Sequence, residues 1–587
     1  MQWQGAQSPE RGVTQEIREE LAVECPAFYM ERRPDSIAVR ARRAAIACGL
    51  ALVLAVVMTW PLVTGLGRLG RTTTMDGLYG IWNVGWVAHS IVTNPASLFD
   101  ANIFYPHRGT LAYSEANIVA GIVGIPAWLL TRNAYAAHNT ALLFAFATSF
   151  LGMWLLAQYL SGHTEAAAAA GILFAFCPYF YSHSAHVQLL MAGGIPLSML
   201  ALHRLADSPS TRRGIALGAA LAAQALACAY YGIFAGLMVG YGVLFLAARR
   251  GLWRERQFWI AVGIALLTAG LLVLPFFIPY LELQRDGGFV RSLDDARRYS
   301  ATWPSYLASP AHVHRPVLAL ARQLGWHVGE VLFPGILAVA FGGLGAALAW
   351  RSARRDEGAT EGRETVMLYG SLGMLALWGS FGPDAYLYTV LYRVVPLFTF
   401  LRAPSRFGLL LVFVLAIFAS LALKRVAPVG RRGLVFSAAF VAVAMAELNV
   451  VPFPWERALP VSTNYRILAG MPRAAVAEFP FYGERIAFPL HAQYMVLSTT
   501  HWMPLVNGYS DYIPQDFREA AAVLDSFPSN DTFAVLQKHR VRYITIHWDM
   551  YGPRAEEIRS KLKPFERYLR PLGNDATMNL YEIVGFP

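Results

Sequence analysis

The chain has 587 residues, of which 56% are apolar and only 15% are charged, and its mean hydropathy is +0.39. Soluble domains average roughly 25% charged residues, so the composition excludes an ordinary soluble protein and indicates a multi-pass membrane protein. The net charge is +11, but the basic residues stand in short clusters between apolar segments, which argues against nucleic-acid binding. The cysteines Cys25, Cys48, Cys177 and Cys228 show no metal or redox spacing, so we expect free thiols.

The N-terminal stretch is polar and ends in arginines next to the first apolar segment. These arginines are Arg32, Arg33, Arg40, Arg42 and Arg43. The stretch is too long for the charged region of a signal peptide and lacks a small-residue cleavage site. We therefore expect residues 1–42 to form a cytoplasmic tail.

Eleven apolar segments approach the length that crosses ~30 Å of hydrocarbon. They lie at about 43–65, 138–160, 164–181, 186–206, 214–230, 231–248, 257–281, 329–350, 365–382, 404–423 and 434–452. With the N-terminus inside, the short basic loops between them fall on the cytoplasmic side, as the positive-inside rule requires. This agreement holds only if the apolar stretch 118–130 does not cross, so we interpret it as a juxtamembrane or re-entrant helix.

The predicted fold is mainly α: a polytopic membrane domain over 43–453 followed by a small extracytoplasmic α/β domain over 454–587. On this topology the loops 66–137 and 282–328, a short loop around 179–188, and the C-terminal domain face outward. In the C-terminal domain, strand-like runs at 475–481, 541–548 and 579–585 alternate with helical stretches.

The first outer loop carries a carboxylate, Asp76, about ten residues beyond the first span. Ionisable groups beside a bilayer are costly unless they have a function. Asp76, Tyr79, Asn83 and Trp86 follow a spacing that places acid, phenol, amide and indole groups on one helical face. Such a face suits a sugar, and a carboxylate can serve as the general base for an attacking hydroxyl.

Other polar residues of the same loop are candidate substrate contacts: Asp100, His107 and Glu115. Two structural alternatives remain open. The loop can form an interfacial helix that lies on the bilayer, and Asp76 or Thr72 to Thr74 can cap the helix.

The second outer loop places His183 and His186 three residues apart. One helical turn can present such a pair to a metal, but two ligands do not make a site. We therefore expect both histidines to line a substrate cavity, with no cofactor required and a divalent metal as the open alternative.

Arginines at the outer end of a later span are candidate contacts for a lipid-linked phosphate: Arg393, Arg402 and Arg406. Guanidinium groups bind phosphate with two parallel hydrogen bonds. The alternative is that they extend to ordinary phospholipid headgroups. The sequence contains no phosphate-binding GxxxxGK[ST] loop, no GxSxG and no HExxH, so any reaction must draw its energy from the substrate.

The chain resembles the GT-C class of integral-membrane glycosyltransferases, which includes protein O-mannosyltransferases, lipid A aminoarabinose transferases and the catalytic subunit of oligosaccharyltransferase. The resemblance covers about residues 40–450. It is carried by the segment order and by the first loop, D-x-x-x-x-x-W-x-x-x-W followed by NPASLFDANIFYPHRGTLAYSE.

The resemblance implies a hexosyl- or pentosyltransferase of the bacterial inner membrane. The sugar would move from a polyprenyl-phosphate or diphosphate carrier to an extracytoplasmic glycan, lipid or protein. Asp76 would engage the acceptor, and attack opposite the phosphate would invert the anomeric centre. Relatives carry a second acidic residue in the second outer loop, where this chain has His183 and His186. A non-catalytic envelope assembly protein and a glycolipid flippase are the alternative functions.

Overall fold

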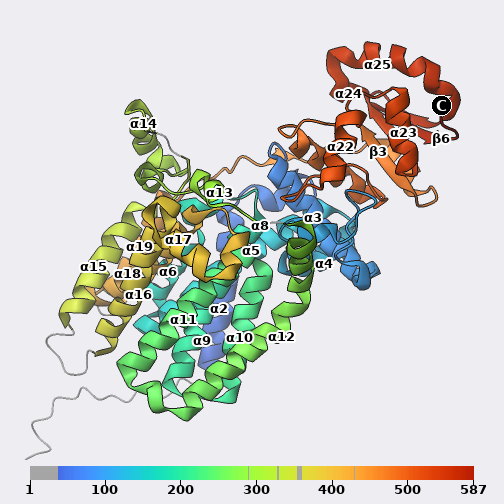
Figure 1. The fold of residues 1–587 in the computed structure, drawn as a ribbon. Helices are drawn as coiled ribbons and strands as arrows, with labels where there is room; N and C mark the ends of the chain where they lie inside the picture. The colour runs from blue at the N-terminus through green and yellow to red at the C-terminus, as the bar shows by residue number, and fades with distance from the viewer. Residues whose placement is uncertain (1–36, 289, 327–328, 353–359, 429) are drawn as a thin grey trace, which may run out of the picture. The chain divides into compact units, whose positions relative to one another are not determined.

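The computed structural model describes residues 37–288, 290–326, 329–352, 360–428 and 430–587 (Figure 1). The chain groups into two compact units, Met1–Gly49 and Leu50–Pro587. The tail arginines Arg32 and Arg33, and Cys25, lie outside the described residues, whereas Cys48, Cys177 and Cys228 are free thiols. The predicted boundary between 453 and 454 falls inside the second unit.

Most of the second unit is helical. Its apolar helices are α2 (Ile37–Met58, which begins in the first unit), α5 (Ala134–Ser161), α6 (Thr164–Ala175), α9 (Gly194–Asp207), α10 (Thr211–Ala227), α11 (Ala229–Arg250), α12 (Arg256–Gly287), α15 (Ile336–Ser352), α16 (Thr360–Ser380), α18 (Gly408–Val426) and α19 (Arg431–Glu447). The short helices α7 (Pro178–Ser182) and α8 (Val187–Leu190) precede α9. A helix or helix pair therefore lies at each of the eleven predicted spans.

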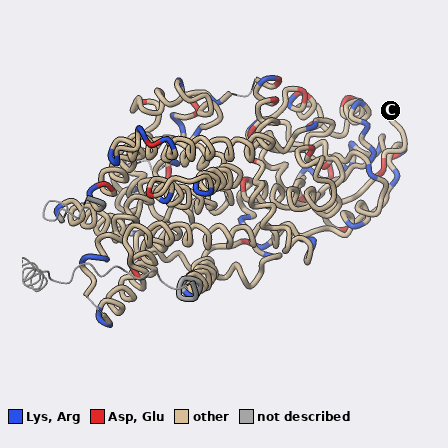
Figure 2. The backbone as a smooth tube through the Cα atoms, turned by 90° about the horizontal axis from the view of Figure 1, so that it is seen from below, with Lys and Arg blue, Asp and Glu red and all other residues tan. Residues whose placement is uncertain are grey.

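Five helical segments are long and apolar enough to cross a membrane by length and composition. These are Ala134–Ser161, Val187–Asp207, Ala229–Arg250, Arg256–Gly287 and Pro404–Val426. They make the chain a membrane protein, and the count of eleven spans stays a prediction. Figure 2 shows the charged residues mostly at helix ends and over the C-terminal part, with long uncharged stretches along the helices.

Small residues allow the helices to pack closely. Gly345 of α15 lies against α18, where an added Cβ would stand 1.8 Å from the Phe418 carbonyl oxygen. Gly218 of α10 approaches α12 in the same way, since its Cβ would lie 2.4 Å from the Ala265 oxygen. Without a hydrophobic force between helices in lipid, close backbone approach of this kind provides much of the packing energy.

Two helices of the first outer loop, α3 (Met75–Thr93) and α4 (Ile118–Thr131), pack against each other and against α5. The 14 residues of α4 span about 21 Å at ~1.5 Å per residue, too short to cross the hydrocarbon alone. Its exposed side chains include Ile122, Leu129 and Leu130. The interpretation of this stretch as a juxtamembrane or re-entrant helix stays a prediction.

The connections before α15 and α18 carry short helices. They are α13 (Leu293–Arg298), α14 (Arg315–Gln323) and α17 (Leu387–Val394). A two-residue ladder joins β1 (Leu69–Gly70) to β2 (Glu456–Arg457), so the start of the first outer loop is tied to the start of the C-terminal part. The ion pair of Arg71 with Glu456 at 3.0 Å reinforces this joint.

The C-terminal part is α/β, as predicted, with a four-stranded sheet of order β3-β4-β6-β5. The strands are β3 (Ala475–Phe479), β4 (Val541–His547), β5 (Leu569–Asn574) and β6 (Met578–Ile583), with β3 and β4 parallel and the other pairs antiparallel. The sequence did not indicate β5, because Pro571 and Gly573 interrupt it; such residues are tolerated at a sheet edge. The helices here are α20 (Thr463–Ala469), α21 (Ala492–Leu497), α22 (Gln515–Leu524), α23 (Asn530–Lys538), α24 (Trp548–Tyr551) and α25 (Ala555–Leu562).

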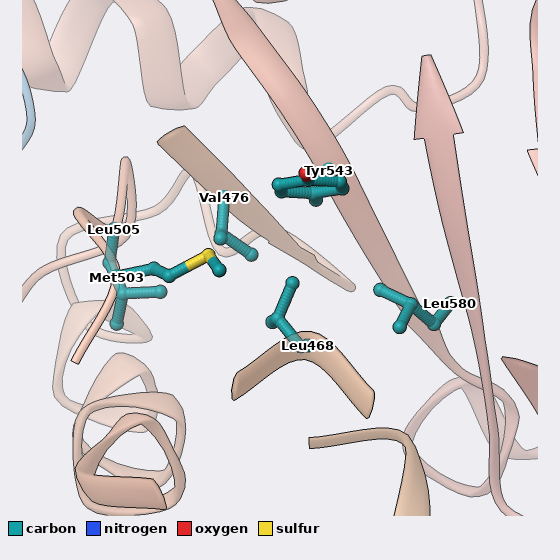
Figure 3. Close-up of a cluster of buried hydrophobic side chains, with 6 residues drawn as sticks. All are labelled: Leu468, Val476, Met503, Leu505, Tyr543 and Leu580. Atoms are coloured by element: carbon teal, nitrogen blue, oxygen red, sulfur yellow. The ribbon is translucent and has the colours of Figure 1, made fainter. Parts of the chain in front are cut away.

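A buried cluster holds α20 and the segment 503–505 against the sheet. It consists of Leu468, Val476, Met503, Leu505, Tyr543 and Leu580 (Figure 3). The segment runs beside β3, where Val506 N–H donates to the Val476 oxygen at 2.9 Å.

The same segment bonds to the first outer loop on its other side. Leu505 N–H donates to the Asn102 oxygen at 2.8 Å, and Phe104 N–H donates to the Asn507 oxygen at 3.2 Å. Gly508 follows, and a Cβ there would lie 2.6 Å from the Phe104 ring, so only glycine fits this approach. The next residues, 509–511, are thereby directed to the cavity described below.

Candidate active site

A cavity of about 190 Å³ lies between the loop 66–137, the helices α10 to α12 and the segment 509–511. Its polar lining residues are Asp76, Tyr79, Tyr113, Ser114, Glu115, Asn117, His186, Gln188, Tyr230, Tyr280, Arg291, Arg402, Arg406, Tyr509, Ser510 and Asp511. Segments that are far apart in the sequence, from Asp76 to Asp511, therefore supply one site.

Asp76 lies in the first turn of α3. The helix begins after Thr74, whose hydroxyl accepts a hydrogen bond from Gly77 N–H at 3.2 Å. Thr74 is thus the cap, which leaves the carboxylate of Asp76 available to other partners. Its position near the helix N-terminus favours the charged form.

Two partners contact the Asp76 carboxylate, and its side chain remains 52% exposed toward the cavity. The Nε2 atom of His186 lies 3.5 Å from Oδ2, and the Tyr509 hydroxyl donates to Oδ1 at 3.2 Å. The pKa of Asp76 is lowered, because the interaction with His186 outweighs the effect of burial and Tyr509 adds to it. Asp76 is therefore a carboxylate at neutral pH.

Tyr79 and Asn83 continue along the α3 face. The Asn83 amide nitrogen donates to the Tyr79 hydroxyl at 3.3 Å and to the Glu115 carbonyl oxygen at 3.1 Å. Asn83 is fully buried and outside the cavity, so its amide ties the helix to the loop. Burial raises the pKa of Tyr79 to about 12, which keeps the phenol protonated as a hydrogen-bond donor.

Glu115 brings a second carboxylate to the cavity. Its Oε1 accepts the hydrogen bond of Ala229 N–H at the start of α11. Burial raises the pKa of Glu115. This carboxyl group is therefore less readily ionised than that of Asp76, although both line one cavity.

The positive side of the cavity is formed by arginines. Asp511 bridges two of them: its Oδ1 lies 2.9 Å from Arg291 and 3.1 Å from Arg402, and its Oδ2 accepts from the Ser114 hydroxyl at 2.6 Å. Burial alone would raise the pKa of Asp511, but Arg402 and Arg291 lower it overall, so Asp511 is ionised at neutral pH.

Arg406 differs from the other two. Its guanidinium carbon lies 4.0 Å from the centre of the Tyr230 ring, a cation–π contact. Among the described residues, no carboxylate forms an ion pair with it. The Tyr230 hydroxyl accepts from Arg402 N–H at 2.6 Å, so one tyrosine positions the backbone at Arg402 and the side chain of Arg406.

An apolar wall continues from these charged groups along α10, α11 and α12. It is formed by Ala225, Leu226, Ile233, Val273, Phe276 and Phe277, with Phe400 and Leu401 from the connection before α18. The cavity therefore has a charged end and a hydrocarbon-like end.

The remaining candidates from the sequence lie elsewhere. Trp86 is buried and donates from Nε1 to the Leu98 oxygen at 2.8 Å, and Asp100 accepts from Gly109 N–H at 2.8 Å within a turn. His107 pairs with Asp516 at 3.0 Å in a neighbouring cavity. Arg393 is exposed and does not line the site.

His183 lies behind the cavity wall. Its ring stacks on Tyr179 with centroids 4.1 Å apart, and its Nε2 lies 3.8 Å from Glu330. Burial lowers the pKa of His183 to about 3, so the ring is neutral. The described residues contain no group of three His, Cys, Asp or Glu side chains placed to hold a metal ion.

Sequence reasoning missed Tyr509 and Asp511, and it treated Arg291 only as part of a basic loop. The stretch Gly508–Tyr512 reads as an ordinary polar turn, and no local pattern indicates that it reaches Asp76 and Arg402. The backbone ladder between the first outer loop and residues 505–507 makes that connection, and such long-range pairing leaves no periodicity in the sequence.

No protein-family model and no curated protein sequence matches the chain. Solved structures match its fold. Arabinofuranosyltransferase AftD from Mycobacteria superposes with a TM-score of 0.53 and 15% identity over 93% of this chain and 41% of AftD, so this chain spans less than half of that protein. The oligosaccharyltransferase of Archaeoglobus fulgidus gives 0.49 and 12% over 91% of this chain and 73% of that one.

ArnT from Cupriavidus metallidurans gives a TM-score of 0.37 and 14% identity over 93% of this chain and 98% of ArnT. At sequence identities this low, the matches concern the fold alone. The evidence for the fold is the AftD superposition, which has a TM-score of 0.53. The chain has a GT-C-like membrane glycosyltransferase fold, as the sequence resemblance implied.

Proposed function

We propose that the chain is a membrane glycosyltransferase that moves a sugar from a polyprenyl-phosphate or diphosphate carrier to an extracytoplasmic acceptor, with Asp76 as general base. The observation that carries this proposal is a single cavity in which an ionised carboxylate, arginines and an apolar wall meet. Each of these three parts matches one part of the reaction.

The apolar wall along α10 to α12 suits the isoprenoid chain of the donor. Because the isoprenoid comes from the bilayer and not from water, its contact with this wall is stabilised by van der Waals packing and not by hydrophobic burial. The arginines at the other end suit the phosphate, since guanidinium groups donate paired hydrogen bonds to phosphate oxygens. A lipid-linked phosphate would thus lie with its sugar toward Asp76.

Asp76 would accept the proton of the attacking acceptor hydroxyl. The new bond forms between that oxygen and the anomeric carbon, the bond from the anomeric carbon to the phosphate oxygen breaks, and the phosphate leaves with the electron pair. The lowered pKa of Asp76 makes it a weak base. A weak base suffices when the sugar is positively charged in the transition state and the hydroxyl becomes acidic as it attacks.

The orientation is part of the proposal. The short basic loops favour a cytoplasmic N-terminus, which would put α3, the cavity and the domain 454–587 on the extracytoplasmic side of a bacterial inner membrane. Neither a cofactor nor a metal enters this mechanism, because the arginines neutralise the leaving phosphate.

The test uses the full chain in lipid nanodiscs with radiolabelled polyprenyl-phosphate and polyprenyl-diphosphate sugars and an envelope extract as acceptor. We expect label to move to the acceptor, stoichiometric release of the polyprenyl carrier, and a product with inverted anomeric configuration by NMR. Absence of transfer across all donors would contradict the proposal, and retained configuration would exclude direct attack.

A further inference from the structure

A second cavity, of about 550 Å³, lies between α3, the end of α4 and the segments 458–461 and 496–502 of the C-terminal part. The described residues that line it are all different from those that line the cavity at Asp76. Asp76 and His89 are 13 positions apart on α3, which is about 20 Å at ~1.5 Å per residue. We propose that this second cavity binds an acidic saccharide and so holds a glycan at a site separate from the proposed catalytic one.

Aromatic rings form one wall of this cavity. The rings of His89 and Trp502 stack with centroids 4.6 Å apart and an interplanar angle of 9°, and Trp128 meets them edge-on at 5.8 and 5.7 Å. The three rings come from α3, from α4 and from the C-terminal part. Such rings offer apolar surface to the C–H groups of a pyranose, and their ring nitrogens can bond to its hydroxyls.

Polar groups of the same wall lack partners within the part of the chain that the structure describes. The Nε1 atom of Trp128 is buried without a hydrogen-bond partner. Neither the half-buried ring of His89 nor the exposed guanidinium of Arg132, at the end of α4, forms a hydrogen bond or ion pair with a described residue. Unpaired polar groups at a cavity favour a ligand that can bond to them, because burial without a partner is costly.

The charge around the cavity selects an anion. None of the described lining residues is acidic, and burial together with Arg132 and Arg473 lowers the pKa of His89 to about 4. His89 is therefore neutral at neutral pH, and the two guanidinium groups are the charges that act on it. Arg473 donates to the Trp502 carbonyl oxygen at 2.9 Å, whereas Arg132 remains available to a ligand. A sugar carboxylate suits it, since guanidinium and carboxylate groups form paired hydrogen bonds.

The backbone supports the same assignment. Arg132 and Trp502 both have a φ of 52°, in the left-handed region that bulky residues rarely adopt. Backbone of this kind is costly and concentrates at ligand-binding positions. A phospholipid headgroup would use the guanidinium of Arg132 but leave the aromatic wall and the Trp128 N–H without a role, so a saccharide is favoured.

Binding of two tetrasaccharides tests this inference without any catalytic step. The probes are α-1,4-linked tetragalacturonate and its fully methyl-esterified form, which has the same rings and no charge, each titrated into the full chain in phosphatidylcholine nanodiscs. We expect wild type to bind the acid about tenfold more tightly than the ester. Arg132→Gln should remove this preference, and Arg298→Gln, at an exposed arginine outside the cavity, should keep it. His89→Ala should weaken binding of both probes about fivefold.

Equal binding of acid and ester by wild type, or an unchanged preference in a folded Arg132→Gln protein, would overturn the inference. Failure of both probes to bind would also overturn it. Phosphatidylglycerol that co-purifies with wild type but not with Arg132→Gln, without binding of either probe, would assign the cavity to a phospholipid headgroup instead. If His89→Ala does not fold, the comparison of acid and ester in wild type and Arg132→Gln decides. Sugar transfer is a separate measurement, so each of these results leaves the proposed function standing.

Discussion

Tyr509 donates a hydrogen bond to Asp76 at 3.2 Å, although the two residues lie 433 positions apart in the chain. The bond joins the C-terminal part to the first turn of α3 at the proposed catalytic carboxylate. The C-terminal part therefore contributes directly to the cavity, and its removal should affect the site as well as any acceptor recognition.

Tyr509→Phe should lower transfer without unfolding the protein. The substitution keeps the ring that contacts Tyr79, with centroids 6.1 Å apart, and removes only the hydroxyl that Asp76 accepts from. A hydrogen bond to a charged group contributes about 1.5 to 3 kcal/mol, so kcat should fall roughly tenfold to a hundredfold. Steady-state kinetics check this, with the melting temperature as the folding control. An unchanged kcat would show that the Tyr509 hydroxyl does not take part in the reaction.

His186→Gln should change the pH dependence of transfer. His186 is the main cause of the lowered pKa of Asp76, so its loss should raise that pKa toward or above the ordinary value of 3.8. Activity requires the carboxylate and is lost as pH falls through the pKa, so the acid limb of the kcat/KM profile should move to higher pH. An acid limb at the wild-type position would show that His186 does not influence Asp76.

Asp511→Asn should destabilise the protein most at neutral pH. The pKa of Asp511 is lowered in the folded state, so its contribution to stability is fully present above the unfolded value near 3.8 and is lost as pH falls through the folded pKa. Asp511 and its two arginine partners are partly exposed, so the loss at neutral pH should be about 1 kcal/mol. Thermal unfolding of wild type and variant from pH 3 to pH 7 should show a gap that narrows toward acid pH. A gap of constant size would contradict this assignment.

Ile233→Trp should distinguish donors by the length of their lipid. Ile233 lies on the apolar wall of the cavity, and a larger side chain there would occupy the path proposed for the isoprenoid. We expect KM to rise about tenfold for a long polyprenyl donor and little for a two-isoprene analogue, with kcat similar for both. Equal effects on both donors would place the lipid elsewhere.

The sequence predicted much of the fold because the relevant signals are local. Apolar length located the helices, and short strand-like runs located β3, β4 and β6. It placed α3 correctly and put Asp76 and Tyr79 on one face, because a helix begun by Thr74 has a fixed period. The same helical spacing predicted that Trp86 would also face the substrate. Trp86 instead packs in the core, where its ring centroid lies 5.6 Å from that of Trp502.

The missing part of the site is long-range. Asp511 reaches Arg291 and Arg402 through a ladder that connects residues 102–105 with 505–507. Helical and strand periodicities describe one element at a time, so they do not reveal which loops meet. The separate placement of His183 and His186 has the same origin, since the chain turns between α7 and α8 and puts one ring in the cavity and the other behind it.

The most direct measurement is sugar transfer by Asp76→Asn in the full chain, beside Asp531→Asn as the matched control. Asp531 also lies in the first turn of a helix, α23, so both variants remove one acidic group from a helix start. We predict that Asp76→Asn lowers kcat by about 100-fold or more while Asp531→Asn retains wild-type transfer. Transfer by a folded Asp76→Asn protein at the wild-type rate would contradict the central claim that Asp76 is the catalytic base.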